Sequence, residues 1–452
     1  MARAATDRRE ANAATGAEPL VSSTFGFSRD ASGAALLGGV SLSKLVRDGA
    51  VATPSYVYDL DAVRDAARRL RAGFGSQRHL VCYAVKANSA GPILRALRGE
   101  GCGADVVSGA ELALALECGI GPEEVVYSGV AKRDDEIDVA LRSGDRGILA
   151  IQIESIEEIP RVEARAKRLG KRARVSVRIN PGVEADTHAH IATGHDEAKF
   201  GVPKADLEHA IDALHNAPNV DLVGISSHVG SQLTAVTDYV AAAKVVLQLA
   251  TVVETALART LEFLDFGGGF GIDYGAGCPV SPADFAARLV ELVANAHRQD
   301  TRVLCEPGRA LVAPFGVLVA TTIMEKRARP TGAMREWLMI DAGMNDLLRP
   351  ALYGARHRIE PLDALPPASG QGRAMRVVGP VCESSDDFGE HTMPLEPVSH
   401  VVIRDAGAYG FTMASEYNGR ALPTEIFLEG GNVAARIEPR RAAAWIKERA
   451  AL

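Results

Sequence analysis

A lysine ends an otherwise apolar run of residues in the segment YAVKAN, where it occupies position 86. Lysine is rarely buried fully in a protein. A desolvated lysine has a lowered pKa and forms Schiff bases with carbonyl cofactors, so Lys86 is a candidate for covalent catalysis. The alternative is an ordinary lysine whose charged end reaches solvent where a strand ends.

A glutamate and a histidine fit the same kind of chemistry. Glu306, in the segment CEPGR, would bond a pyridine nitrogen and keep it protonated, so that the ring accepts electrons from a carbanion. The alternative is a structural ion pair with Arg309. His228, in the segment HVGSQ, would stack on such a ring, and Ser231 would hold a phosphate oxygen. A single histidine is more often an ordinary core residue.

Three consecutive glycines, Gly267, Gly268 and Gly269, follow another apolar run, and Gly271 comes soon after. Glycines let backbone amides approach an anion, and phosphate sites in barrels often follow the seventh and eighth strands. A dinucleotide-binding fingerprint would need the spacing GxGxxG and a helix directly after it, whereas the spacing here is GxGxG. A plain tight turn is the other alternative.

Eight short β-branched runs, separated by amphipathic stretches, must position these residues. The runs span 79–87, 104–108, 125–129, 148–153, 174–180, 222–230, 262–269 and 302–308. Ser281-Pro282 predicts the start of one intervening helix, with serine as the N-cap and proline in the first turn. Strands that are apolar on both faces and separated by helices indicate a parallel sheet. Eight such units favour a closed α/β fold, the (β/α)8 TIM-type barrel, over an open doubly wound sheet.

Each run begins apolar and ends in a chemically distinctive residue. These ends are Lys86, Asp105 with Ser108, Ser128, Asn180, His228, Gly267–Gly269 and Glu306. Because all strands of a (β/α)8 barrel end at the same face, we expect these side chains to converge in one mouth.

The predicted domain organisation has four parts. Residues 1–18 are expected to be a disordered tail, because they are polar and alanine-rich without an apolar core. Residues 19–50 are expected to pack with a β domain, and residues 51–315 to form the barrel. Residues 316–452 contain short strands divided by Gly, Pro and charged turns, which predicts an all-β domain closed by a final helix near 439–452.

The composition sets further limits. A chain of 452 residues exceeds the usual size of one hydrophobic core, and its net charge of −7 argues against a nucleic-acid surface. The six cysteines show no CxxC pair, so we expect free thiols in a reducing cytoplasm, mostly buried, and no metal site. No stretch approaches the 18 or more apolar residues that a membrane span requires.

The motifs YAVKAN, HVGSQ, GGGFG and CEPGR, in this order and spacing, resemble those of fold-type III pyridoxal-phosphate decarboxylases, over about residues 55–430. The resemblance implies a (β/α)8 barrel with a β domain, pyridoxal 5'-phosphate as cofactor, and a homodimer whose active sites are shared across the interface. It makes Lys86 the Schiff-base lysine, Glu306 the partner of the pyridine nitrogen and His228 the ring-stacking histidine. The other cofactor-binding residues would be Ser231, Gly267, Gly268, Gly269, Gly308, Arg309 and Tyr409.

The segments RINP (178–181), KFG (199–201) with the preceding His188, and IDAGMND (340–346) are similar to those of the diaminopimelate decarboxylases within this family. The resemblance implies a substrate site that binds a carboxylate and a distal ammonium. Its residues would be Arg309, Arg349, Tyr353 and Tyr409 for the carboxylate side and Glu383 for the ammonium. A second carboxylate calls for a guanidinium fork, whereas a decarboxylase that produces diamines would need an acidic pocket.

Two segments of the β domain, Cys382-Glu383-Ser384 and 405–410, resemble segments that this family inserts into the barrel of the partner subunit. Cys382 would protonate the substrate carbon after carbon dioxide leaves. The alternative is a buried cysteine in a strand. Ser385 stands where the family has glycine, which puts the geometry of the local turn in doubt.

The expected reaction is decarboxylation of meso-diaminopimelate to L-lysine, the last step of lysine biosynthesis. The alternatives are a sister decarboxylase that acts on a carboxylated polyamine precursor or a carrier-bound amino acid, and a non-catalytic homologue. A racemase is disfavoured because the alanine racemase family places an arginine, and not a glutamate such as Glu306, at the pyridine nitrogen.

Overall fold

A computed structural model describes residues 25–47, 51–182, 199–329, 332, 335–368, 370–439 and 442–451. The expected disordered tail at 1–18 lies outside the described residues, as does His188.

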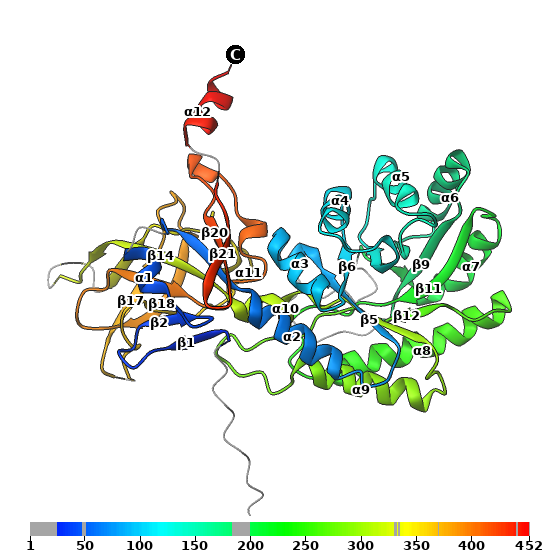
Figure 1. Cartoon of the computed structure of the whole chain (residues 1–452), viewed down its shortest axis with the longest axis horizontal. Coiled ribbons are helices and arrows are strands. Elements are labelled where there is room, and N and C mark those ends of the chain that lie inside the picture. The colour runs from blue at the N-terminus through cyan, green and yellow to red at the C-terminus, as the bar shows by residue number, and fades with distance from the viewer. Residues whose placement is uncertain are drawn as a thin grey trace, which may run out of the picture.

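Eight parallel strands form a closed barrel (Figure 1). They are β5 (His79–Ala84), β6 (Gly103–Val106), β7 (Val125–Tyr127), β8 (Ala150–Ile153), β9 (Ala173–Asn180), β11 (Val220–Ser226), β12 (Phe263–Asp265) and β13 (Arg302–Cys305). The order of hydrogen-bonded strands is β9-β11-β12-β13-β5-β6-β7-β8, and pairing of β8 with β9 closes the ring. A short strand, β10 (Val202–Pro203), pairs in parallel with the end of β9. The predicted (β/α)8 barrel is confirmed.

Helices surround the barrel (Figure 1). They are α2 (Leu60–Ala72), α3 (Gly91–Gly99), α4 (Gly109–Glu117), α5 (Asp134–Arg142), α6 (Glu158–Leu169), α7 (Leu207–His215), α8 (Thr237–Leu257) and α9 (Pro282–Asn295). The predicted start of α9 is confirmed: the Ser281 hydroxyl accepts a hydrogen bond from the Asp284 amide, and the Asp284 carboxylate accepts one from the Ser281 amide. This reciprocal capping box fixes where the helix begins.

Helix α8 is, by length and composition, apolar enough to cross a membrane, which the sequence analysis did not expect. One face of α8 is buried in the main core through Tyr239, Val246 and Val253. The Tyr239 ring meets Phe270 edge-on, with 5.4 Å between ring centroids. A helix that packs on a barrel needs an apolar face toward the core.

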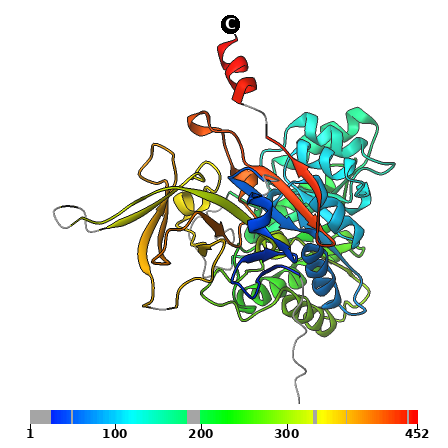
Figure 2. The same cartoon turned by 60° about the vertical axis from the view of Figure 1, so that its left-hand side comes forward.

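The second domain is built on a sheet with the strand order β18-β17-β15-β14-β4-β20-β21, which extends away from the barrel (Figure 2). Its strands are β4 (Ser55–Asp59), β14 (Gly316–Lys326), β15 (Glu336–Ile340), β17 (Arg373–Val378), β18 (Asp387–Met393), β20 (Thr424–Glu429) and β21 (Asn432–Ile437). Strand β19 (His400–Ile403) pairs with β14, and β16 (Ile359–Pro361) pairs with β19. Short helices α10 (Arg309–Val312) and α11 (Arg349–Tyr353) lie between strands, and α12 (Ala442–Ala450) ends the described chain.

Strand β4 differs from the expected domain boundary, which placed residues 51–315 in the barrel. It pairs antiparallel with β14 and parallel with β20, so it belongs to the sheet of the second domain. All five residues of β4 are buried. A strand buried on both faces has the same apolar pattern in either kind of sheet, and the sequence therefore did not reveal its partner.

The described part of the N-terminal segment lies against the second domain. Strands β1 (Phe27–Arg29), β2 (Ala35–Leu37) and β3 (Val40–Ser41) form a small sheet that leads into α1 (Leu42–Arg47). Leu37 and Leu42 share one hydrophobic cluster with Val317, Val402 and Ile426 of the second domain.

Candidate active site

Lys86 lies directly after β5, in the one-turn 3-10 helix η1 (Val85–Ala87), and forms an ion pair with Asp105 of β6. The Asp105 side chain is fully buried, whereas that of Lys86 is 38% exposed. Burial favours the neutral amine, but Asp105, then Tyr409 and Glu306, outweigh it and raise the pKa of Lys86 above its ordinary value. The expectation of a lowered pKa is therefore wrong for the ligand-free chain, because a buried carboxylate lies beside the amine.

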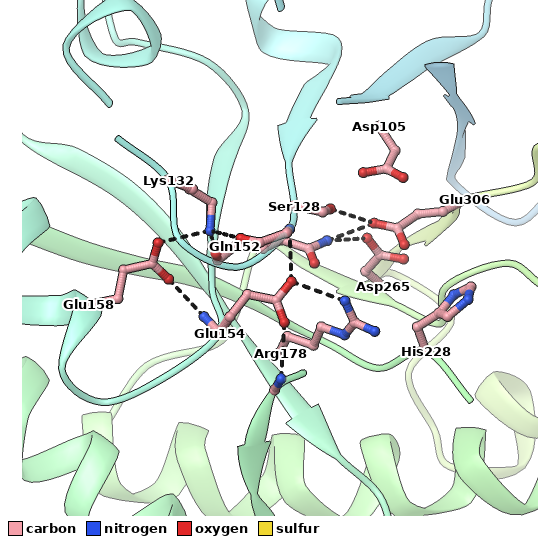
Figure 3. Close-up of polar contacts among 12 residues, drawn as sticks. Asp105, Ser128, Lys132, Gln152, Glu154, Glu158, Arg178, His228, Asp265 and Glu306 are labelled. Atoms are coloured by element: carbon pink, nitrogen blue, oxygen red, sulfur yellow. Dashed lines mark hydrogen bonds and ion pairs between the residues drawn. The ribbon is translucent and has the colours of Figure 1, made fainter. Parts of the chain in front are cut away.

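Glu306 follows β13 and lies among polar side chains from other strands of the barrel (Figure 3). Its Oε1 accepts from Nε2 of Gln152 at 2.7 Å and from the Ser128 hydroxyl at 3.5 Å. The predicted alternative, an ion pair of Glu306 with Arg309, does not occur among the described contacts. Arg309 instead donates to Tyr274 and Ser231.

Asp265, the last residue of β12, forms a second buried carboxylate beside Glu306. Gln152 Nε2 also donates to Asp265 Oδ2, at 3.2 Å. Burial raises the pKa of Asp265 to about 6. Burial, followed by repulsion from Asp265 and Asp105, raises the pKa of Glu306 well above its ordinary value. A cation placed against Glu306 would relieve this repulsion and favour its charged form.

His228 faces the glycine segment after β12. Its Nδ1 accepts a hydrogen bond from the Gly268 amide at 3.2 Å, which leaves the proton of the neutral ring on Nε2. Burial, with added repulsion from Arg178 and Lys86, lowers the pKa of His228 well below its ordinary value. The ring is therefore neutral at neutral pH and suited to stacking.

The three glycines permit a close approach of three strand ends. A Cβ on Gly267 would lie 2.4 Å from the Ser227 carbonyl oxygen, and one on Gly268 would lie 2.0 Å from that of Glu306. Gly269 has a φ of +89°, and a Cβ there would lie 2.2 Å from the Gly230 oxygen. Any side chain in this segment would push apart the ends of β11, β12 and β13.

Two arginines converge on the hydroxyl of Tyr274. Arg309 donates to it at 2.8 Å and Arg349 donates to it at 3.0 Å. Arg309 also donates to the Ser231 hydroxyl at 2.8 Å, and Arg349 Nη1 lies 2.9 Å from His357 Nε2. Each arginine is only 7% exposed.

Neither Arg309 nor Arg349 has a carboxylate partner among the described residues. Buried charges are normally paired, so two such guanidiniums side by side form a site for anions. Burial, with repulsion from Arg309, lowers the pKa of Arg349 despite the opposing effect of Tyr274. The buried Nε of Arg309 has no hydrogen-bond partner. Tyr353, at the end of α11, is half-buried and contributes to the raised pKa of Arg309, after larger effects that include Tyr274 and Tyr409.

Tyr409 and its segment contact the barrel of their own chain. The Tyr409 amide donates to the Ala87 oxygen at 2.7 Å, and Asn88 Nδ2 donates to the Gly407 oxygen at 3.0 Å. The Arg309 guanidinium lies over the Tyr409 ring, 5.0 Å from its centroid. A Cβ on Gly308 would lie 3.4 Å from the Tyr409 hydroxyl and closer still to the Ala87 side chain. Residues 405–410 therefore pack on their own barrel, and the expectation that they reach a partner subunit stays a prediction.

Cys382 and Glu383 lie apart from these residues, on the loop between β17 and β18. Cys382 is exposed, unlike the cysteine buried in a strand that was the alternative. Its amide donates to Asn418 Oδ1 at 3.1 Å, and Glu383 Oε1 accepts from the Tyr417 hydroxyl at 2.6 Å. No described contact joins either residue to Lys86.

Ser385 does not disturb the loop. Its φ is not in the left-handed region, and its hydroxyl lies 3.5 Å from the Met344 sulfur. The turn is instead held by the Asp386 carboxylate, which accepts from the amides of Met344 and Val381 at 2.6 Å each. The loop therefore needs no glycine at position 385.

The sequence analysis missed several residues of this site. Gln152 had a usable signal, because it is a polar residue inside the apolar run ILAIQI. Asp265 likewise ends the run that precedes the glycines. Tyr274 and His357 had none, because both lie in irregular segments without periodicity. Ser108 was expected at the mouth, but its hydroxyl accepts from the Glu111 amide at 3.2 Å and caps α4.

Comparison with protein families supports one chemistry for this site. Residues 60–313 match the pyridoxal binding domain of the pyridoxal-dependent decarboxylases. Diaminopimelate decarboxylase of Helicobacter pylori is 40% identical over 381 residues, with 83% of this chain and 90% of that protein covered. The Zymomonas mobilis enzyme of the same name is 39% identical over 395 residues, with 86% and 90% covered.

Solved structures agree with the sequence comparison. Diaminopimelate decarboxylase of Helicobacter pylori in complex with L-lysine has a TM-score of 0.80 at 36% identity, with 90% of this chain and 99% of that chain covered. The M. jannaschii enzyme, also with L-lysine, has a TM-score of 0.84 at 30% identity, with 94% and 97% covered. This chain belongs to the diaminopimelate decarboxylase family of pyridoxal-dependent decarboxylases.

Proposed function

We propose that this chain decarboxylates meso-diaminopimelate to L-lysine and carbon dioxide with pyridoxal 5'-phosphate as its cofactor. The observation that carries the proposal is the grouping of an amine, a carboxylate pair and two guanidiniums without carboxylate partners in one barrel mouth. The likeness to decarboxylases solved with L-lysine supports the choice of substrate.

The described residues fit the cofactor. Two buried polar atoms of the site, Asp105 Oδ1 and Arg309 Nε, have no hydrogen-bond partner among the described residues, as expected where a polar group is to bind. The Ser231 hydroxyl accepts from Arg309, so its own proton is free to bond a phosphate oxygen. Gly267 and Gly268 already donate to Asp265 and His228, and we therefore assign the Gly269 amide to the phosphate.

The residues of the mouth take distinct roles. When bound, the cofactor supplies a ring that accepts electrons from the bond to the departing carboxylate. Lys86 would hold the cofactor covalently. When the amine of Lys86 is released, Asp105 would form an ion pair with its ammonium form. Glu306 bonds the ring nitrogen and keeps its proton in place. His228, neutral, covers the ring and excludes water. Tyr409, held over Arg309, closes the side near Gly308.

The arginine pair binds the end of the substrate that does not react. Arg309 links two parts of the site, because one of its nitrogens donates to the Ser231 hydroxyl and the other donates to the Tyr274 hydroxyl. Arg349 shares the Tyr274 hydroxyl, so the two guanidiniums would clamp one carboxylate together, with Tyr353 beside them. A fork of this kind favours a substrate with a second carboxylate over a diamine precursor.

We assign the other half of the site to a second copy of the chain. Cys382 and Glu383 are exposed and make no described contact with the barrel mouth of their own chain. In a homodimer, Cys382 would return a proton to the substrate carbon, and Glu383 would bind the distal ammonium. Free cysteines throughout are compatible with a cytoplasmic enzyme.

The test is release of carbon dioxide from a panel of amino acids by the purified chain and by Lys86→Ala. We expect activity on meso-diaminopimelate, little on lysine, ornithine or carboxylated polyamine precursors, and a loss of at least about 10³-fold in Lys86→Ala. Lys167→Ala, on the exposed face of α6, is the matched control. Release from another member of the panel would reject the substrate, and an active Lys86→Ala would reject the mechanism.

A further inference from the structure

We infer that Gln152 is a positioning residue that directs Glu306 toward the ring nitrogen of the cofactor by donating hydrogen bonds to both buried carboxylates. The inference rests on the proposed function. It adds a role for Gln152 of β8. This residue contacts Glu306, but its strand does not neighbour the strands whose ends carry the phosphate-binding residues or Lys86.

The geometry of Gln152 restricts what its side chain can do. The residue is 1% exposed, and its amide nitrogen lies 2.7 Å from Glu306 Oε1 and 3.2 Å from Asp265 Oδ2. A side-chain amide has two N–H groups, and here each has a carboxylate oxygen to bond. Figure 3 shows this nitrogen directed at both acids, at the end of a chain of contacts that begins at Lys132.

The backbone of Gln152 is held as well. The Nζ of Lys132 donates to the Gln152 carbonyl at 2.5 Å and to the Gly129 carbonyl at 2.7 Å. Its charge is balanced by Glu158, whose Oε1 lies 2.9 Å away. Lys132 is 2% exposed, so this anchor is shielded from solvent. A side chain on such a support keeps its direction when a ligand enters.

The hydrogen bonds to Glu306 determine which of its two carboxylate oxygens is available to the ring nitrogen. Both described hydrogen bonds to this carboxylate, from Gln152 and from Ser128, end on Oε1. Oε2 accepts neither of these two bonds and is the atom that would meet the ring nitrogen. Burial, and after it repulsion from neighbouring carboxylates, raises the pKa of both Asp265 and Glu306, so loss of the two N–H donors of Gln152 would favour the protonated acids further.

The experiment uses holoenzyme loaded with cofactor that is labelled with 15N at the ring nitrogen. The chemical shift of this nitrogen reports whether it is protonated. We expect the protonated value in the wild type and a shift toward the unprotonated value in Gln152→Met, which keeps the volume and removes both donors. We expect kcat to fall by about 10- to 100-fold, with KM for meso-diaminopimelate changed by less than about threefold.

Two further variants make the outcome decisive. Gln152→Glu keeps the shape and replaces donors by acceptors, so it decides the question if Gln152→Met does not fold. Gln77→Met is the matched control, because Gln77 is another buried glutamine of the barrel, and its amide donates only to backbone oxygens, among them those of Gln299 and Thr301. Its 15N shift should equal that of the wild type.

The possible results separate the two proposals. A wild-type enzyme that holds no cofactor on Lys86 would overturn the proposed function itself. A wild-type shift in both Gln152 variants, with the cofactor still bound, would overturn the role of Gln152 and leave the proposed function standing.

Discussion

The mouth of the barrel and the loop between β17 and β18 are built in opposite ways. Lys86, Glu306 and His228 come from three distant parts of the chain and are brought together by strands of one closed sheet. Cys382 and Glu383 are neighbours in sequence, lie on an irregular loop and are exposed. The residues of the mouth contact one another within one chain. The loop exposes Cys382 and Glu383, and no described contact joins them to the mouth.

The two regions therefore suit different tasks in the proposed reaction. Groups that must hold a buried ring in one orientation lie at the ends of barrel strands, where packing fixes them. Groups that would approach a substrate from outside lie on an exposed loop, which the second subunit of the proposed homodimer would bring to the mouth. Tyr409 belongs to the first group although it lies within the second domain, between β19 and β20, since its backbone and ring contact the barrel.

Removal of the charge at the ring nitrogen should have the largest effect. We expect Glu306→Gln to lower kcat by about 10²- to 10³-fold, because a neutral amide does not hold a proton on the ring. Steady-state decarboxylation measures the effect. Glu262→Gln is the control: Glu262 forms a partly exposed ion pair with Arg174 just before β12, at the opposite end of the barrel. If Glu306→Gln retained wild-type kcat, the mouth would not have the chemistry assigned to it.

A change in the arginine pair should have an intermediate effect, on binding more than on rate. Arg349→Lys keeps a positive charge but loses the planar fork that bonds a carboxylate through two nitrogens. We expect KM for meso-diaminopimelate to rise by roughly 10- to 100-fold. Arg298→Lys, in the ion pair with Glu254 between α8 and α9, should leave KM unchanged. An equal effect on kcat at saturating substrate would give Arg349 a role in the chemical step instead of in substrate binding.

The smallest effect is expected in the loop. Asp386→Asn replaces an acceptor of two backbone hydrogen bonds by a group that accepts with one oxygen only. We expect kcat to fall by about tenfold at most, because Cys382 and Glu383 lose their fixed direction while the mouth is intact. The 15N shift of the ring should not change. Ser385→Gly, on the same loop, should match the wild type, and a loss there comparable with that in Asp386→Asn would show that the turn depends on position 385.

The strand pattern was enough to predict the barrel and the face at which its strands end. All parallel strands of a barrel end at one face whatever their sequence. A residue at a strand end, such as Lys86 or Glu306, therefore lies at that face. The same rule failed for Ser108, which lies beyond its strand and caps a helix instead.

Other parts of the site had no signal in a single sequence. Tyr274 joins two arginines from a loop without periodicity, and its position depends on long-range packing. Strand β4 has an apolar pattern that fits either sheet. The raised pKa of Lys86 depends on Asp105, which lies 19 positions away in sequence and on the neighbouring strand.

Mixing of two inactive variants tests the division between the two regions most directly. Lys86→Ala lacks the amine of the mouth, and Cys382→Ala lacks the thiol that we propose as the proton donor. If each site combines the mouth of one chain with the loop of the other, a refolded equal mixture has one intact site in each mixed dimer. We predict about a quarter of the wild-type activity per chain. Activity no higher than the mean of the two separate variants would contradict a site shared between subunits.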